Sequence, residues 1–206
     1  VNGDIHRRRA EGKLRNLDSL LDEDPLEGKI GIGHTRWATH GIPNTVNAHP
    51  HANAAVALVH NGIIENFQPL RAELMSLGHA FETETDTEVI LGLIQEYLNH
   101  GMSPQGATTE MLQRVKGAFA LGIIFAGHDD LLIGARRGCP LAVGYGDNAM
   151  FLGSDSLALA PLTERISYLE EDDWVEISRN KASIYNGIGK KIERPIRVTS
   201  RTDSGI

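Results

Sequence analysis

The spacing of apolar residues predicts amphipathic helices in the first half of the chain. Two segments repeat apolar residues at helical intervals, Asn66–Leu77 and Thr87–His100, and a glycine follows each of them. Thr85 and Glu88 form a capping-box pattern at the start of the second segment. Two shorter helices are predicted over Leu14–Leu21 and Glu110–Val115.

Short apolar runs bounded by Gly, Asn or Asp predict a series of strands. They are Ile30–His34, Val56–His60, Phe119–Phe125, Leu131–Ala135, Leu141–Tyr145, Met150–Gly153, Ile166–Leu169, Trp174–Ile177 and Ser183–Tyr185. Helices and strands are grouped rather than alternating along the chain, which disfavours a doubly wound parallel sheet. The pattern therefore predicts an α+β fold in which helices lie outside two inner sheets.

Composition narrows the classes of function that the chain serves. Its 206 residues suit one domain with a sizeable core. A formal charge of −7 argues against a nucleic-acid-binding face, and no apolar run approaches the roughly 20 residues that span a bilayer. No signal-peptide pattern opens the chain, and the single cysteine, Cys139, fits a reducing cytoplasm. Nothing in the composition requires a metal or another cofactor.

The segment 34–41, HTRWATHG, is the strongest candidate for chemistry. The planar guanidinium of Arg36 suits two-point binding of a small carboxylate, and an ion pair with a nearby acid is the alternative. Trp37 either shields a site from water or packs in the core. The neighbouring Thr39 and His40, with Gly41 as a hinge, favour a binding role for the segment.

Two further features fit acyl-transfer chemistry on an amino-acid-sized substrate. Asn61 and Gly62 follow a short apolar run and form either an ordinary turn or an oxyanion hole, made by a side-chain amide and a backbone N–H. Asp86 lies near the predicted start of a helix, where the helix dipole alone accounts for a carboxylate. Its alternative role is to bind a substrate ammonium group opposite Arg36.

Histidines gather in the same part of the chain, so a metal site has to be weighed. They are His34, His40, His49, His51 and His60. Their spacing matches no tight zinc pattern, and packing and hydrogen bonding within loops are the favoured explanation. Cys139 follows two arginines that would lower a thiol pKa, but no orienting histidine is evident beside it in the sequence. A buried, unreactive thiol is the favoured role for this cysteine.

Four stretches resemble the N-terminal glutaminase domain of the glucosamine-6-phosphate synthases, a group of class II glutamine amidotransferases. They are GIGHTRWATHG at 31–41, NAHPH at 47–51, VHNGIIEN at 59–66 and ETDTEVI at 84–90. The resemblance implies the N-terminal nucleophile hydrolase fold, a four-layer αββα sandwich. It also implies hydrolysis of glutamine, in the cytoplasm, to glutamate and to ammonia that is used to make glucosamine 6-phosphate from fructose 6-phosphate.

The resemblance assigns roles to the candidate residues. Arg36 would bind the glutamine α-carboxylate and Asp86 its α-ammonium, with Asn61 and Gly62 as the oxyanion hole. The remaining expected contacts come from a loop that closes over glutamine, in which Trp37 gates ammonia transfer, and from residues that line or support the pocket. These lining residues are Thr39, His40 and His49.

The nucleophile of this family is a cysteine at the mature N-terminus, which this chain does not present. Val1-Asn2-Gly3-Asp4 reads as a hairpin turn without its upstream strand, and a frayed terminus is the alternative. We therefore expect a glutaminase domain over residues 1–194 that is incomplete at its N-terminus. Residues 195–206 would be a linker toward absent sugar-phosphate isomerase domains, which in the full-length homodimer receive the ammonia.

We expect the 206-residue polypeptide to lack glutaminase activity, because Cys139 falls in a different part of the sequence from the family nucleophile. Two other functions stay open at this point. One is a non-catalytic module that binds glutamine without turnover. The other is the glutaminase domain of an enzyme related to amidophosphoribosyltransferase, against which HTRWATHG argues.

Overall fold

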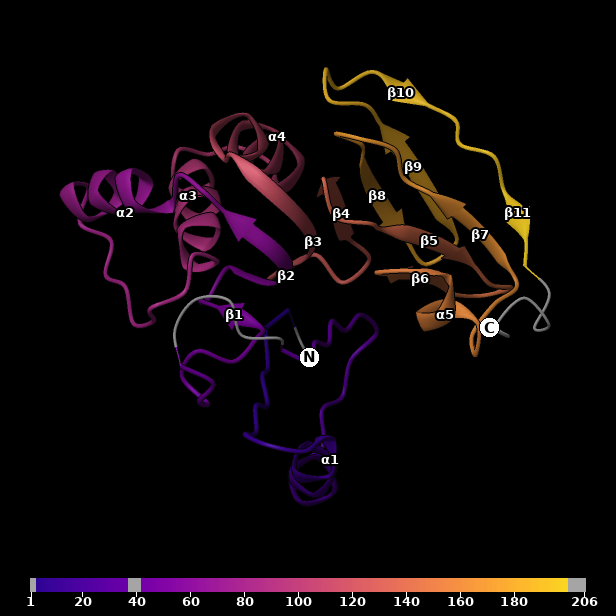
Figure 1. Cartoon of the computed structure of the whole chain (residues 1–206), viewed down its shortest axis with the longest axis horizontal. Coiled ribbons are helices and arrows are strands. Elements are labelled where there is room, and N and C mark those ends of the chain that lie inside the picture. The colour runs from indigo at the N-terminus through magenta and orange to yellow at the C-terminus, as the bar shows by residue number, and fades with distance from the viewer. Residues whose placement is uncertain (1–2, 37–41, 200–206) are drawn as a thin grey trace.

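The strands form two antiparallel sheets in a computed structural model that describes residues 3–36 and 42–199 (Figure 1). The seven-stranded sheet has the order β1-β2-β3-β4-β8-β9-β10, and the four-stranded sheet has the order β11-β7-β5-β6. The larger sheet contains His51–Ala52 (β1), Val56–Ile64 (β2), Gly117–Phe125 (β3), Leu132–Arg137 (β4), Trp174–Ser178 (β8), Lys181–Tyr185 (β9) and Lys191–Ile192 (β10). The smaller sheet contains Ala142–Tyr145 (β5), Met150–Gly153 (β6), Arg165–Tyr168 (β7) and Arg197–Val198 (β11).

Helices flank the sheets, and one helix stands apart. The helices α2 (Phe67–Ser76), α3 (Glu88–Asn99) and α4 (Pro104–Arg114) lie together beside β2 and β3 (Figure 1). The short α5 (Ser156–Leu159) follows β6. In contrast, α1 (Leu14–Glu23) projects from the body of the molecule and buries none of its residues.

Three apolar clusters lie between successive layers and explain the stacking. The largest joins the strands β2, β3 and β4 to α3 and α4, through side chains such as Leu58, Ile94 and Ile123. A second joins the two sheets through Val143 of β5 and Val175 of β8. A third lies between the smaller sheet and Leu159 of α5. The order helix, sheet, sheet, helix agrees with the layered α+β sandwich that the sequence predicts.

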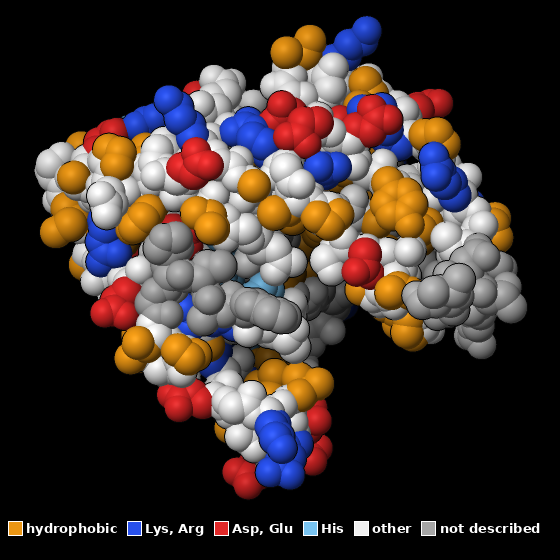
Figure 2. Space-filling view, viewed as in Figure 1, with side chains coloured by type: hydrophobic (Ala, Val, Ile, Leu, Met, Phe, Trp, Pro, Cys, Tyr) orange, Lys and Arg blue, Asp and Glu red, His pale blue; other side chains and the backbone are white. Residues whose placement is uncertain are grey.

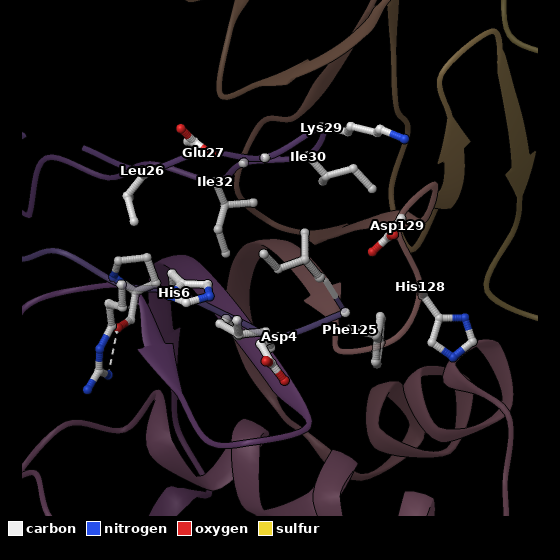
Figure 3. Close-up of a pocket in the computed structure, with 18 of the residues that line it drawn as sticks. Asp4, His6, Leu26, Glu27, Lys29, Ile30, Ile32, Phe125, His128 and Asp129 are labelled. Carbon is white, nitrogen blue, oxygen red and sulfur yellow. Dashed lines mark hydrogen bonds between the residues drawn. The ribbon is translucent and has the colours of Figure 1, made fainter. Parts of the chain in front are cut away.

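The predicted strand Ile30–His34 is wrong. This segment forms no ladder in the described structure and instead lines two cavities. The larger cavity, of about 680 Å³, lies between the chain's first residues and the segment 26–32. Figure 3 shows Leu26, Ile30 and Ile32 pointing into this cavity, while Glu27 points away from it. An apolar alternation predicts a strand only when a neighbouring strand supplies hydrogen bonds, and sequence alone does not reveal that neighbour.

Several boundaries also differ from the prediction. The helix expected over Glu110–Val115 begins earlier, at Pro104, because the Ser103 side chain caps it by accepting from the N–H of Gly106. The predicted capping box does not form. The Thr85 hydroxyl lies 3.2 Å from His51 Nε2, and the Glu88 carboxylate accepts the N–H groups of residues 82 and 83.

Both ends of the chain extend beyond the described residues. Residues 1 and 2 of the predicted hairpin turn lie outside the described residues. The expected linker over 195–206 begins with a docked stretch, since Arg197 and Val198 of β11 pair with β7. Residues 200–206 lie outside the described part of the chain. None of the described helices is long and apolar enough to cross a membrane.

Candidate functional site

The predicted site residues that the structure describes gather around β2 and the start of α3. Asn61, which belongs to β2, lines a cavity of about 440 Å³ between the two sheets. His34 lines the same cavity, and its Nε2 lies 2.7 Å from the Asn61 side-chain oxygen. Figure 2 shows a histidine side chain at the surface near the centre of one face of the molecule. His34 and Asn61 therefore make one part of the cavity wall polar.

Asn61 and Gly62 do not form a turn, so that alternative is wrong. Both lie within β2, where Asn61 is opposite Ala120 and Gly62 is opposite Phe119 of β3. Gly62 has a φ of +120°, and a Cβ atom at this position would overlap the carbonyl oxygen of Ala118. The close approach of β3 thus requires glycine here, whatever else its N–H does.

Four histidines and two threonines form a polar cluster that we call the histidine cluster: His34, His49, His51, His60, Thr85 and Thr87. The rings of His34 and His49 have centroids 4.4 Å apart, and those of His49 and His51 are 4.7 Å apart. The Thr87 hydroxyl lies 3.2 Å from His49 Nε2 and 3.0 Å from His60 Nδ1. The cluster thereby connects β1, β2 and the residues that precede α3.

Burial favours the uncharged form of three histidines of the cluster, His34, His49 and His51. The pKa of His49 is lowered to about 2 and that of His51 to about 3, mainly by burial and in smaller part by neighbouring histidines and arginines. The pKa of His34 is lowered as well, mainly by burial, which outweighs the hydrogen bond to Asn61. The Arg36 guanidinium contributes to all three shifts, so Arg36 lies within electrostatic range of the cluster.

Arg36 and Asp86 both border the histidine cluster. Arg36 Nη1 donates to the carbonyl of Ile42 at 2.9 Å, which links the described chain on the two sides of residues 37–41. Asp86 is 2% exposed, and its Oδ2 accepts the N–H of Ile64 at 2.7 Å. Asp86 lies one residue before Thr87, the N-cap of α3, and not in the first helical turn as the sequence predicted. Its observed contact instead ties the start of α3 to the end of β2.

Three of the predicted site residues, Trp37, Thr39 and His40, lie outside the described residues. Among residues 3–36 and 42–199, no group of three or more His, Cys, Asp or Glu side chains is placed to hold a metal ion. The Nδ1 atoms of His34 and His49 are buried and make no hydrogen bond within the described chain. The cluster therefore holds two buried ring nitrogens that no described group satisfies.

Cys139 is not placed or activated as a nucleophile. Its side chain packs against the apolar cluster between the two sheets, and it is not among the residues that line the Asn61 cavity. Burial raises the pKa of the Cys139 thiol and outweighs the effect of Arg136, so the predicted lowering by two arginines is wrong. Arg137 pairs with Asp172 at 2.5 Å, which directs its charge elsewhere.

Sequence reasoning missed the two threonines and the role of His34. Thr85 and Thr87 flank Asp86 in the sequence. The hydroxyl of Thr85 contacts His51, and that of Thr87 contacts His49. The short repeat TxTxT at residues 83–87 is the signal for them. No local pattern could pair His34 with Asn61, since 27 residues separate them.

Comparison with known proteins connects this geometry to a family. Residues 22–194 match the profile of the glutamine amidotransferase domain. The chain is 57% identical over 193 residues to a glutamine–fructose-6-phosphate aminotransferase (isomerizing) of Mesorhizobium japonicum, covering 94% of this chain and 32% of the relative. It is 58% identical over 190 residues to the protein of that name from Bradyrhizobium diazoefficiens, covering 92% of this chain and 31% of the relative. The chain thus spans about a third of the length of these relatives.

Solved structures of similar fold support the same family. Glutamine phosphoribosylpyrophosphate amidotransferase from B. subtilis, complexed with ADP and GMP, superposes with a TM-score of 0.62 at 25% identity and covers 75% of this chain and 34% of its own. The allosteric regulatory enzyme of purine biosynthesis gives a TM-score of 0.63 at 26% identity, with the same coverage. These similarities confirm the α+β sandwich of the N-terminal nucleophile hydrolase type.

Proposed function

Because this chain belongs to the family of glutamine amidotransferase domains, we propose that it binds L-glutamine at the histidine cluster, between β2 and the start of α3, for release of ammonia. The ammonia would serve synthesis of glucosamine 6-phosphate from fructose 6-phosphate in a sugar-phosphate isomerase domain. The observation that carries the proposal is the meeting of Arg36, Asn61 and Asp86 around one histidine cluster. We propose a glutaminase domain over residues 1–194; the family profile ends at residue 194, and the following β11 docks on the smaller sheet of that domain.

The proposed glutamine site holds the substrate by both charges of its amino-acid group. Arg36 pairs with the α-carboxylate and Asp86 with the α-ammonium, which leaves the side-chain amide directed at Asn61 and Gly62. Burial of Asp86 strengthens this recognition, because a charge pair shielded from water is weakly screened. Trp37, Thr39, His40 and His49 complete the proposed pocket, with Trp37 gating the passage of ammonia.

The chemistry needs a thiolate that attacks the amide carbon of glutamine. The carbonyl oxygen then carries negative charge, which the Asn61 amide and the Gly62 N–H stabilise. The C–N bond of the intermediate then breaks as its nitrogen takes the proton that the thiol gave up, so that NH3 leaves and a thioester remains. Water hydrolyses this thioester to glutamate and regenerates the thiol. Cys139 does not line the cavity, so we propose that the 206-residue polypeptide binds glutamine without releasing ammonia by itself.

Calorimetry with L-glutamine tests the proposed binding. We expect heat from the 206-residue polypeptide, and loss of Arg36 in Arg36→Ala should weaken binding by about 10- to 100-fold. Arg8→Ala is the matched control, since Arg8 pairs with Asp24 on the surface. Absence of heat with millimolar glutamine, or equal affinity in both variants, would contradict the proposal.

A substrate lacking the ammonium group tests Asp86 separately. Asp86→Asn keeps an oxygen that accepts from Ile64 N–H, so the local fold is retained while the charge is lost. Glutaramic acid, which is glutamine without its α-ammonium, should bind the variant and the unaltered protein equally. A large difference in glutaramic acid affinity between the two proteins would contradict the proposed pairing of Asp86 with the α-ammonium group.

Two other functions have weaker support. A module that binds glutamine without catalysis is consistent with the position of Cys139 outside the Asn61 cavity. A chimera distinguishes such a module from an enzyme. In the chimera, residues 1–194 replace the matching segment of the Mesorhizobium japonicum relative, and ammonia release from glutamine is measured. An amidophosphoribosyltransferase-like enzyme fits less well, because the B. subtilis amidotransferase is 25% identical to this chain and the Mesorhizobium japonicum relative is 57% identical.

The cytoplasmic location and the homodimer stay predictions, which fractionation and analytical ultracentrifugation of the full-length protein would test.

A further inference from the structure

The contact between His34 and Asn61 has a fixed direction. A carbonyl oxygen accepts hydrogen bonds and does not donate them, so His34 Nε2, 2.7 Å from Asn61 Oδ1, carries the proton. The neutral His34 ring is therefore protonated on Nε2 and bare on Nδ1. The buried Nδ1 makes no hydrogen bond within the described chain, as expected of a nitrogen that carries no proton, and the His60 backbone lies close enough to favour a proton on the ring.

This direction decides which end of the Asn61 amide faces the cavity. When the side-chain oxygen is held by His34, the two N–H groups of the planar amide point the other way. A rotation of 180° would replace these donors with an oxygen and repel a developing oxyanion. The terminal torsion of asparagine has broad, roughly two-fold minima, so the amide itself does not select the productive orientation.

The histidine cluster holds the His34 ring in place. His49 packs on it with centroids 4.4 Å apart, and the Thr87 hydroxyl fixes His49 from the other side at 3.2 Å. Thr87 also bonds His60, which precedes Asn61 in β2 and projects to the opposite face of the strand. The same cluster thus supports both the His34 ring and the strand that carries Asn61.

We propose that His34 is a positioning residue that sets the Asn61 amide for the oxyanion hole by donating from Nε2 to the amide oxygen. The proposal rests on the proposed glutaminase function. His34 acts through Asn61 and makes no bond to the reacting atoms. Its loss should therefore slow turnover and leave glutamine affinity nearly unchanged.

Nitrogen NMR of the 206-residue polypeptide tests the direction of the contact without any substitution. We expect the ¹⁵N shifts of His34 to report a protonated Nε2 and a bare Nδ1 at neutral pH. The shifts of His79, whose Nε2 lies 2.7 Å from Glu96, supply a reference from the same molecule. A proton found on His34 Nδ1 alone would overturn the proposal.

Turnover is measured in the chimera described above. In His34→Gln the side-chain N–H₂ replaces the donor, whereas His34→Ala removes it. Loss of one oxyanion donor costs about 10²- to 10³-fold in kcat, so we expect a loss of about 10- to 100-fold for His34→Ala from disorder of the amide. We expect KM for glutamine to change less than about 3-fold, because substrate binding does not need the oriented amide. His34→Gln should retain most of the activity, and His79→Ala is the control.

A double substitution completes the test. If His34 acts through Asn61, the variant with both His34→Ala and Asn61→Ala has the same kcat as Asn61→Ala alone. Independent, multiplicative losses would overturn the positioning role, as would equal activities of His34→Ala and His34→Gln. Failure of the proposed function itself gives a different result, since the unaltered chimera would then release no ammonia.

Discussion

Two polar clusters in this molecule differ in how their buried groups are compensated: one relies on uncharged side chains and the other on ion pairs. In the histidine cluster, burial favours the neutral form of His34, His49 and His51, and the Nδ1 atoms of His34 and His49 make no hydrogen bonds inside the described chain. Between β7 and β8, arginines form ion pairs with a run of acids at 170–173. There Arg194 pairs with both Asp173 and Glu170.

The difference separates polar groups that hold the fold from those available to a ligand. Asp173 is 1% exposed and binds Arg194 through both carboxylate oxygens, at 2.8 Å and 3.0 Å. That ion pair holds Arg194, in the segment before β11, against the residues before β8. Both charges are therefore neutralised within the fold. The histidine cluster does the reverse, because it leaves the Nδ1 atoms of His34 and His49 without hydrogen bonds inside the described chain. The two clusters should therefore respond differently to pH and to substitution.

Acid should produce the largest change, and it acts on the histidine cluster. The pKa values of His49 and His51 are about 2 and about 3 in the folded protein, far below the ordinary value, so the unfolded chain binds more protons. The stability that the two neutral histidines contribute is complete above about pH 6.5. It falls progressively as the pH drops toward their pKa values in the folded protein. At about pH 5 each histidine should cost about 2 kcal/mol of unfolding free energy. Urea titrations at several pH values measure this slope.

The matched variant for the acid experiment removes both titrating groups. A protein with His49→Gln and His51→Gln should lose most of the pH dependence between about pH 7 and pH 5. If its stability declines with acid as steeply as that of the unaltered protein, other groups cause the decline and the contrast between the clusters fails.

The charged cluster should respond most strongly to removal of one partner. Arg194→Ala leaves the buried Asp173 carboxylate with the N–H of Glu170 but without its cation. We expect a loss of about 3 kcal/mol in unfolding free energy, because a buried charge without its partner is strongly destabilising. Arg8→Ala breaks a surface pair and should cost less than about 1 kcal/mol. Equal losses in the two variants would show that burial is unimportant at Asp173.

A backbone substitution at Gly62 should have the next largest effect. Its φ of +120° and the carbonyl of Ala118 leave no room for a Cβ atom, so Gly62→Ala should cost about 1–3 kcal/mol. Gly31→Ala is the control, since no atom lies within 4 Å of a Cβ built there. Thermal unfolding of both proteins provides the comparison, and a fully stable Gly62→Ala would contradict the described register of β2 and β3.

The smallest effect should come from the thiol. Cys139 is half-buried beside an apolar cluster and outside the Asn61 cavity, so Cys139→Ser should change stability by about 1 kcal/mol or less. It should leave glutamine affinity unchanged. A marked loss of binding by calorimetry would return Cys139 to the site.

The sequence predicted elements well where local chemistry determines them. The apolar repeat of α3 and the continuous apolar run of β3 are local patterns, and both elements form close to their predicted positions. The segment 30–34 failed because a strand depends on a neighbour that lies elsewhere in the chain. The Asn-Gly step failed as a turn for the same reason, since β3 extends β2 through it.

The candidate site was predictable by residue type and not by contact. Resemblance pointed to Arg36, Asn61, Gly62 and Asp86, yet the hydrogen bonds of Thr85 and Thr87 depend on where α3 begins. The Asp86 contact with Ile64 likewise joins residues that are 22 positions apart. Such pairings follow from the stacking of layers, which a linear pattern does not encode.

The central claim is that glutamine binds between β2 and the start of α3. The most direct test is an NMR titration of the ¹⁵N-labelled 206-residue polypeptide with L-glutamine. We predict saturable shifts in the Asn61 side-chain amide and in the backbone N–H groups of Gly62 and Thr87, all absent in Arg36→Ala. Shifts confined to Asp4, His6 and Lys29, which line the larger cavity, or no shifts at all with millimolar glutamine, would contradict the account.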